Sequence, residues 1–232
     1  MTTADGPVQV RELTDLLLAT SSFEDYTQQI VDLAAVRVAP GASCGLTMRI
    51  DGKTRTVAAS GDLASQVDEI QYGTGHGPCL ESMESGEVIV VVDLLDDRRW
   101  GDYRRHAIEQ GVRSSLSLPI RGRSEIASGA LNLYFRTPGA FSPGQVQRGM
   151  HFADQCSGAL QLATRLAEQA TLTAQMREAM ESRSVIDQAI GIVMAQNRCD
   201  ASTAFAVLRT ASQNRNVKLR VVAADIVGSL AR

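Results

Sequence analysis

The spacing of apolar and polar positions changes several times in the first part of the chain. From Arg11 to Val38 the apolar side chains recur every three or four residues, which predicts a helix that ends before Pro40. Further along, short β-branched or alternating runs are separated by turn residues such as Asp51-Gly52, which is typical of a hairpin. The predicted strands are 44–50, 54–60, 87–92, 114–120 and 128–135, with helices at 63–72 and 97–110. This pattern predicts a first domain that mixes strands and helices.

The rest of the chain shows only helical spacing. No proline follows Pro143, and apolar positions from Gln145 to Met180 predict one long amphipathic helix with a broad, alanine-rich stripe. Three shorter helical stretches follow, and Asp200 and Asn216 are placed to cap the second and the third of them. Three short helices bury little apolar surface, so we expect a partner chain or the long helix to complete their core.

The composition is typical of a globular protein with one large or two smaller domains. The chain has 232 residues, of which 44% are hydrophobic and 21% are charged. No apolar run approaches the ~20 residues that cross a membrane, and the first residues lack the basic start and apolar run of a secretory signal. We therefore expect a cytoplasmic protein with no membrane partner.

Residues that often carry chemistry are scattered along this sequence. The four cysteines lie far apart and form no Cys-x-x-Cys pair, which indicates a reducing compartment and argues against a zinc site. His76 and Cys79 have the spacing of metal ligands, but two ligands do not close a site. We predict no metal site, no cofactor and no enzymatic activity.

Charge is distributed unevenly along the chain. The net charge is −3, yet five cations and a single acid, Asp200, lie between Arg198 and Arg220. Such asymmetry indicates two domains with different partners. Arginine binds phosphate, and Asn or Gln can pair with base edges, so this amide-rich basic segment suits a nucleic acid. The basic loop itself has no aromatic residue, since Phe205 is the only one after Phe152, and we expect any base stacking to use arginine planes.

Three stretches of this region resemble the ANTAR domain, an RNA-binding antitermination module. They are Arg183–Met194, Ala204–Arg209 and Ser212–Arg220. Many relatives have Lys where this chain has Ile190, which either removes an RNA contact or replaces a lysine stem that packs. Gly191 lies inside a predicted helix and is expected to allow close helix packing together with Ala189. The candidate RNA-binding residues are Arg183, Gln188, Arg198, Arg209, Ser212, Gln213, Asn214, Arg215, Asn216, Lys218 and Arg220.

The first domain resembles the GAF domain that precedes ANTAR in bacterial regulators. The matching stretches are 75–80, 90–93, 111–120 and 129–134. The resemblance implies an α+β fold, with an antiparallel sheet flanked by helices, followed by a long connector helix and an all-α three-helix ANTAR bundle. The implied division is a GAF-like sensory domain at 10–165, a helical connector at 166–180 and the ANTAR domain at 181–232. GAF domains differ in their ligands, and the candidate ligand-binding residues here are His76, Cys79 and Trp100.

The two resemblances together imply a signal-responsive transcription antiterminator. ANTAR domains are expected to bind paired stem-loops with hexanucleotide loops in nascent mRNA, which keeps a terminator hairpin from forming. Two loops imply two RNA-binding domains and hence a homodimer, with a small molecule as a candidate GAF ligand. The alternative is a ligand- or redox-sensing GAF dimer that acts through a protein partner and carries a degenerate ANTAR domain.

Overall fold

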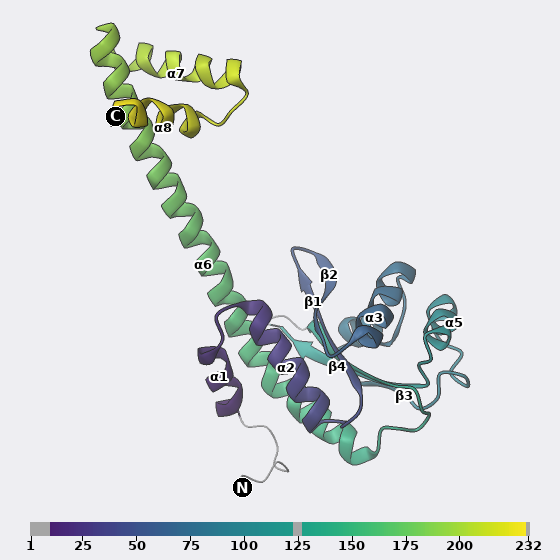
Figure 1. Ribbon diagram of the computed structural model, residues 1–232. Coiled ribbons are helices and arrows are strands. Elements are labelled where there is room, and N and C mark those ends of the chain that lie inside the picture. The colour runs from purple at the N-terminus through teal and green to yellow at the C-terminus, as the bar shows by residue number, and fades with distance from the viewer. Residues whose placement is uncertain (1–9, 123–126, 231–232) are drawn as a thin grey trace. The chain divides into compact units, whose positions relative to one another are not determined.

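The structure is a computed structural model that describes residues 10–122 and 127–230 (Figure 1). The chain divides into two compact units, Met1–Ala167 and Glu168–Arg232. Helix α6 (Pro143–Asn197) contributes residues to both units, and each unit has its own hydrophobic core. None of the described helices combines the length and the apolar character that a membrane span requires.

The described part of the first unit is built on a five-stranded antiparallel sheet of order β2-β1-β5-β4-β3 (Figure 1). The strands are β1 (Ser43–Ile50), β2 (Lys53–Ala59), β3 (Ile89–Val91), β4 (Ser114–Arg121) and β5 (Ala127–Phe135). The hairpin predicted at Asp51-Gly52 joins β1 to β2, and both turn residues have positive φ. The antiparallel sheet flanked by helices, which the resemblance implied, is confirmed.

The two faces of the sheet differ in chemistry because apolar and polar residues alternate along the central strands. In β4, Leu116 and Leu118 belong to the apolar core, whereas Ser115 and Ser117 point to the opposite face. Asn132 of β5 pairs with Ser117 and shares its face. The sheet therefore has one apolar face and one polar face.

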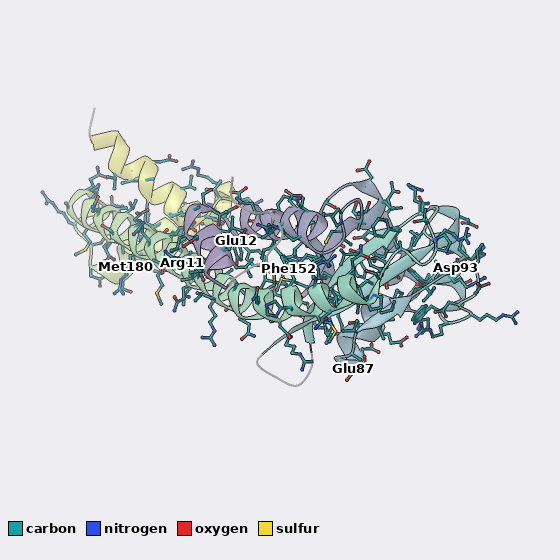
Figure 2. All side chains as sticks on the ribbon, turned by 90° about the horizontal axis from the view of Figure 1, so that it is seen from below. Arg11, Glu12, Glu87, Asp93, Phe152 and Met180 are labelled. Carbon is teal, nitrogen blue, oxygen red and sulfur yellow. The ribbon has the colours of Figure 1, made fainter. Side chains whose placement is uncertain are left out.

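Helices cover both faces. They are α1 (Val10–Ala19), α2 (Phe23–Arg37), α3 (Asp62–Thr74), α4 (Pro78–Ser85) and α5 (Gly101–Glu109), together with the first part of α6. Helices α2 and α6 pack on the apolar face, where Phe152 of α6 is fully buried (Figure 2). Helices α3, α4 and α5 cover the polar face, which has two small apolar clusters, one around Tyr103 and one formed by Cys79, Met83 and Ala130. The buried polar side chains of the sheet therefore lie under α3, α4 and α5.

The prediction of a single helix from Arg11 to Val38 is wrong, because the chain leaves the helix between α1 and α2. The Thr20 hydroxyl donates to the Leu16 carbonyl, and the Ser22 hydroxyl accepts from the backbone N–H of Asp25 at 3.0 Å. Hydroxyl side chains that bond the local backbone compete with the helix and favour its ends. Helix α2 therefore begins with its own cap at Ser22.

The second unit consists of the end of α6, α7 (Ala201–Arg215) and α8 (Leu219–Leu230). The predicted long helix and the first of the three shorter helices form one continuous element, α6. Asp200 caps α7 as predicted, because its carboxylate accepts from the Thr203 N–H at 2.8 Å. Asn216, with φ of +50°, ends α7 rather than capping α8, so that expectation is wrong. The core is formed by Ala189, Val193, Ala204, Leu208, Val222 and Ala223.

Gly191 does not allow close helix packing, contrary to expectation. It is exposed, and a Cβ at this position would meet nothing within 4 Å among the described atoms. Its neighbour Ala189 is fully buried, and Ile190 packs against the same core. The Ile190 side chain therefore contributes to the packing of this core. The predicted connector at 166–180 stays a prediction.

Candidate functional site

The candidate RNA-binding residues are distributed over all three helices of the second unit. Eight of them lie on the last two turns of α7, in the α7–α8 turn and at the start of α8. They are Arg209, Ser212, Gln213, Asn214, Arg215, Asn216, Lys218 and Arg220. Arg183 and Gln188 lie on α6, and Arg198, with φ of +50°, lies between α6 and α7. The structure thus gathers most of the candidates around one turn.

Ion pairs separate the candidate RNA-binding cations of this unit into two groups. Arg215 pairs with Asp225 at 2.7 Å, Arg220 pairs with Glu178, and Arg183 lies 3.9 Å from Asp187. The Arg220 guanidinium holds the pKa of Glu178 below its usual range. By contrast, Arg198, Arg209 and Lys218 form no ion pair with any described residue. These three cations are therefore available to an external phosphate without breaking an internal pair.

Two of the polar candidates hold the α7–α8 turn together. The Ser212 hydroxyl donates to the Val217 carbonyl at 2.6 Å, and the Val217 N–H donates to the Ser212 carbonyl at 3.2 Å. Asn216 takes the left-handed conformation that ends α7, and its N–H donates to the Gln213 carbonyl. Asn tolerates that conformation better than most residues. Ser212 and Asn216 therefore shape the turn, while the Gln213 and Asn214 side chains are exposed on it.

A buried carboxyl lies at the centre of the polar sheet face in the first unit. Asp68 of α3 is fully buried and accepts hydrogen bonds from the Tyr134 hydroxyl at 2.5 Å and the Asn132 amide at 3.0 Å. The Thr56 hydroxyl donates to its other oxygen at 3.2 Å. Burial raises the pKa of Asp68 to about 7, although these hydrogen bonds act to lower it. The carboxyl therefore changes charge near neutral pH.

A second set of bonds links this carboxyl network to α4. The Gln71 side-chain oxygen Oε1 accepts from the Cys79 backbone N–H at 2.7 Å, and the Gln71 side-chain amide donates to the Tyr134 hydroxyl at 3.0 Å. The Cys79 thiol donates to the Thr47 hydroxyl at 3.4 Å, and burial raises its pKa to about 12. Cys79 is therefore a neutral hydrogen-bond donor in the core rather than an accessible nucleophile.

Several polar atoms near this network have no hydrogen-bond partner among the described residues. They are the Asn132 side-chain oxygen Oδ1 and the hydroxyls of Ser115, Ser117 and Tyr103. Buried polar atoms are usually paired, so these unpaired atoms distinguish the polar face from the rest of the core. The polar face is thus the candidate sensing site of the first unit.

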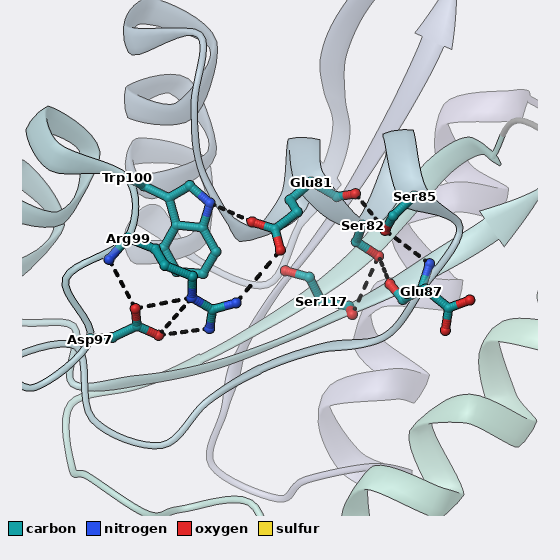
Figure 3. Close-up of polar contacts among 8 residues, drawn as sticks. All are labelled: Glu81, Ser82, Ser85, Glu87, Asp97, Arg99, Trp100 and Ser117. Carbon is teal, nitrogen blue, oxygen red and sulfur yellow. Dashed lines mark hydrogen bonds and ion pairs between the residues drawn. The ribbon is translucent and has the colours of Figure 1, made fainter.

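Trp100 lies in a separate cluster that joins α4 to the β3–α5 loop (Figure 3). Its indole N–H donates to Glu81 at 2.7 Å, and the Arg99 guanidinium lies 4.2 Å from the ring centroid. Arg99 in turn pairs with Asp97 at 2.7 Å and with Glu81 at 3.5 Å. Trp100 itself has φ of +55°, which is rare for a bulky residue and indicates local strain.

The three predicted ligand-binding residues are not brought together. Cys79 is buried in the polar network, Trp100 is fixed to Glu81, and His76 is exposed in the loop between α3 and α4. Asp68, Gln71 and the other members of the network are not among the site residues predicted from the sequence. A signal was present, since Ala64, Val67, Asp68 and Gln71 follow the helical spacing of a buried stripe whose last two members are polar.

The described residues contain no obvious chemistry for a metal or a nucleophile. No group of three or more His, Cys, Asp or Glu side chains within the described ranges could hold a metal ion. The stretch Gly41-Ala42-Ser43-Cys44-Gly45 has the Gly-x-Ser-x-Gly spacing of a hydrolase elbow. Ser43, however, begins β1 instead of lying on a strand-to-helix turn, so the required geometry is missing.

Comparison with known families identifies both units. The GAF domain model matches residues 20–161, more than half of the chain, and the ANTAR domain model matches residues 174–227. The chain belongs to the GAF-ANTAR family. GAF and ANTAR are regulatory domains, so the domain composition of this GAF-ANTAR protein is that of a regulator. No curated protein sequence matches the chain.

Solved structures support the fold of the GAF unit. The GAF domain of a phosphoenolpyruvate-protein phosphotransferase from Coxiella burnetii is 21% identical with a TM-score of 0.52, over 69% of this chain and 94% of that one. Free methionine-R-sulfoxide reductase from Neisseria meningitidis, solved with its substrate, is 14% identical with a TM-score of 0.50, over 69% and 89%. At these identities the likeness shows the fold alone.

Proposed function

We propose that this GAF-ANTAR protein is a signal-responsive transcription antiterminator. The ANTAR unit binds paired hexaloop stem-loops in nascent mRNA and keeps the terminator hairpin from forming, and the GAF unit controls this binding. The ANTAR match over 174–227 carries the proposal. The protein acts in the cytoplasm, where nascent bacterial transcripts lie, and has no catalytic step.

The charges of the ANTAR unit support an RNA partner. Arg198, Arg209 and Lys218 are exposed and unpaired among the described residues, and amide side chains surround the α7–α8 turn. Arginine suits phosphate and guanine edges, and amides suit adenine edges, in single-stranded loops whose bases are accessible.

An exposed stretch of α6 supports a homodimer. Every residue from 171 to 180 is exposed, and Leu172, Met176 and Met180 follow one another at intervals of four residues, with Met180 74% exposed. Residues four apart share one side of a helix, and apolar stripes of this kind are usually covered. A second copy of the chain covers this stripe and provides the second RNA-binding domain for the second loop.

Direct RNA binding tests the proposal. The purified full chain is titrated with a synthetic RNA of two hexaloop stems, with a single-stem RNA and duplex DNA as controls. We expect selective binding of the two-stem RNA, and Arg209→Ala should weaken it. The control is Arg55→Ala, which removes an exposed cation on β2 of the GAF unit and should leave RNA binding unchanged. Equal affinity for all three nucleic acids, or none for any, contradicts the proposal and favours the alternative of a GAF dimer that acts through a protein partner.

A further inference from the structure

Helix α7 presents an aromatic ring on its surface. Phe205 is 41% exposed, although phenylalanine belongs to the residue types that are most often buried. It is the only aromatic residue of the ANTAR unit. The ring lies close to the basic turn in sequence, where RNA-binding residues are expected but stacking groups are scarce.

The orientation of α7 is determined by its buried residues. Ala204 and Leu208 are fully buried and pack in the core of the ANTAR unit. Phe205 and Arg209 each follow one of these residues, so they lie side by side along one flank of the helix, next to the core but outside it. Phe205 is thus a neighbour of Arg209, a candidate RNA-binding cation that forms no ion pair with any described residue.

The same flank continues toward the α7–α8 turn. Ser212 and Gln213 lie three and four residues after Arg209, and Asn216 lies three residues after Gln213. At helical spacing Ser212 and Gln213 form one row with Phe205 and Arg209, and Asn216 follows as the cap that ends α7. The row combines an aromatic face, a free guanidinium and exposed amides, which are the groups that bind an unstacked base and its phosphate.

We propose that Phe205 is a stacking platform for an unpaired loop base of the bound RNA, with Arg209 beside it on the phosphate backbone. This inference rests on the proposed RNA-binding function and adds a specific contact to it. Stacking on the ring requires no hydrogen bond, so it orders a loop base while the amides of the turn select its edges.

The test separates the effect of the aromatic ring of Phe205 from the effect of its apolar bulk. Phe205→Leu keeps an apolar side chain without a π-face, Phe205→Trp keeps a π-face, and Val207→Ala removes an apolar group that is 44% exposed on the other flank of α7. Each full-length variant is titrated with the two-stem hexaloop RNA, in which single loop bases are replaced by 2-aminopurine, whose fluorescence is quenched on stacking. Thermal melting by circular dichroism confirms that the variants fold.

We expect Phe205→Leu to weaken RNA binding about 5- to 150-fold and to abolish quenching at one loop position, because that range corresponds to the loss of one base–aromatic stack. Phe205→Trp retains quenching, and Val207→Ala binds as the unaltered chain does. If the unaltered chain binds the RNA and Phe205→Leu binds equally well, the stacking role is wrong while the proposed function stands. If the unaltered chain does not bind, both are wrong. If Phe205→Leu instead changes the oligomeric state of the RNA-free protein, the ring belongs to a protein interface and the inference is overturned.

Discussion

The buried carboxyl of Asp68 makes the stability of the GAF unit depend on pH in a direction opposite to that of most aspartates. Burial raises its pKa from 3.8 to about 7 in the folded state. Between these two values the folded chain holds a proton that the unfolded chain releases. The free energy of unfolding therefore falls as pH rises through this window, by up to about 1.4 kcal/mol per pH unit, and levels off above the folded pKa.

The magnitude follows from the size of this shift. Between pH 5 and pH 8 the GAF unit loses about 2.5 kcal/mol through Asp68 alone. Other carboxyls also titrate near the lower end of that range, so the quantity to measure is the difference between the unaltered chain and Asp68→Asn. The variant is uncharged at every pH, and its stability lacks this contribution.

Urea unfolding followed by tryptophan fluorescence measures this difference. Trp100 is the only tryptophan of the chain and packs against the cluster that contains Tyr103 and Tyr134, so it reports on the region around Asp68. We expect the stability of the unaltered chain relative to Asp68→Asn to fall by about 2.5 kcal/mol from pH 5 to pH 8. Asp96→Asn, at an exposed carboxyl, is the control and should follow the unaltered chain. Parallel curves for Asp68→Asn and the unaltered chain would refute the reasoning.

Three further predictions concern packing and local contacts. Gly77→Ala should destabilise the GAF unit by about 1–3 kcal/mol, because Gly77 has φ of +153° and a Cβ there would collide with the Gln71 side chain. Gly52→Ala is the control. Gly52 also has positive φ but has open space around it, so this substitution should cost less in the same urea titration. Leu208→Ala should lower the stability of the ANTAR unit by about 2–5 kcal/mol, because it leaves a cavity in a small core. Thermal melting followed by circular dichroism measures this loss. A loss no larger than that of Val207→Ala would show that the core is not packed as described. Glu81→Ala should shift the fluorescence emission of Trp100 to longer wavelength, because the indole N–H then bonds to water. Glu81→Gln keeps an acceptor and should keep the original emission. Identical spectra for both variants would contradict the contact.

The sequence pattern was sufficient to predict the sheet because its strands carry strong local signals. Strand β4 is almost entirely buried and reads as a nearly continuous run of serine and apolar residues, and β1 and β2 flank an Asp-Gly turn. The ends of helices were harder to predict. The break before Ser22 depends on two hydroxyl groups that bond the local backbone, a weak signal inside an otherwise regular helical pattern.

The polar network of the GAF unit could not be predicted from local sequence. Asp68 and Asn132 are 64 residues apart, and only the fold brings the carboxyl of one to the amide of the other. Gly191 illustrates the reverse error, since a glycine within a helix suggested close packing, whereas its surroundings are open. For the ANTAR unit, the sequence located the basic segment, but it could not separate the arginines that already have carboxylate partners from those that have none.

Under the proposed function, that separation has a consequence for how salt affects RNA binding. Asp225 and Glu178 act as tethered counterions of Arg215 and Arg220, and they take the place that a dissolved anion would otherwise occupy. When such an arginine binds an RNA phosphate, the cation condensed on that phosphate is released, but the displaced carboxylate takes up a cation from the solution, so the net release is small. The slope of log affinity against log salt, about −0.7 for each phosphate contact to a single strand, therefore counts chiefly Arg198, Arg209 and Lys218. An RNA complex of this protein can contain more arginine–phosphate contacts than its salt dependence indicates.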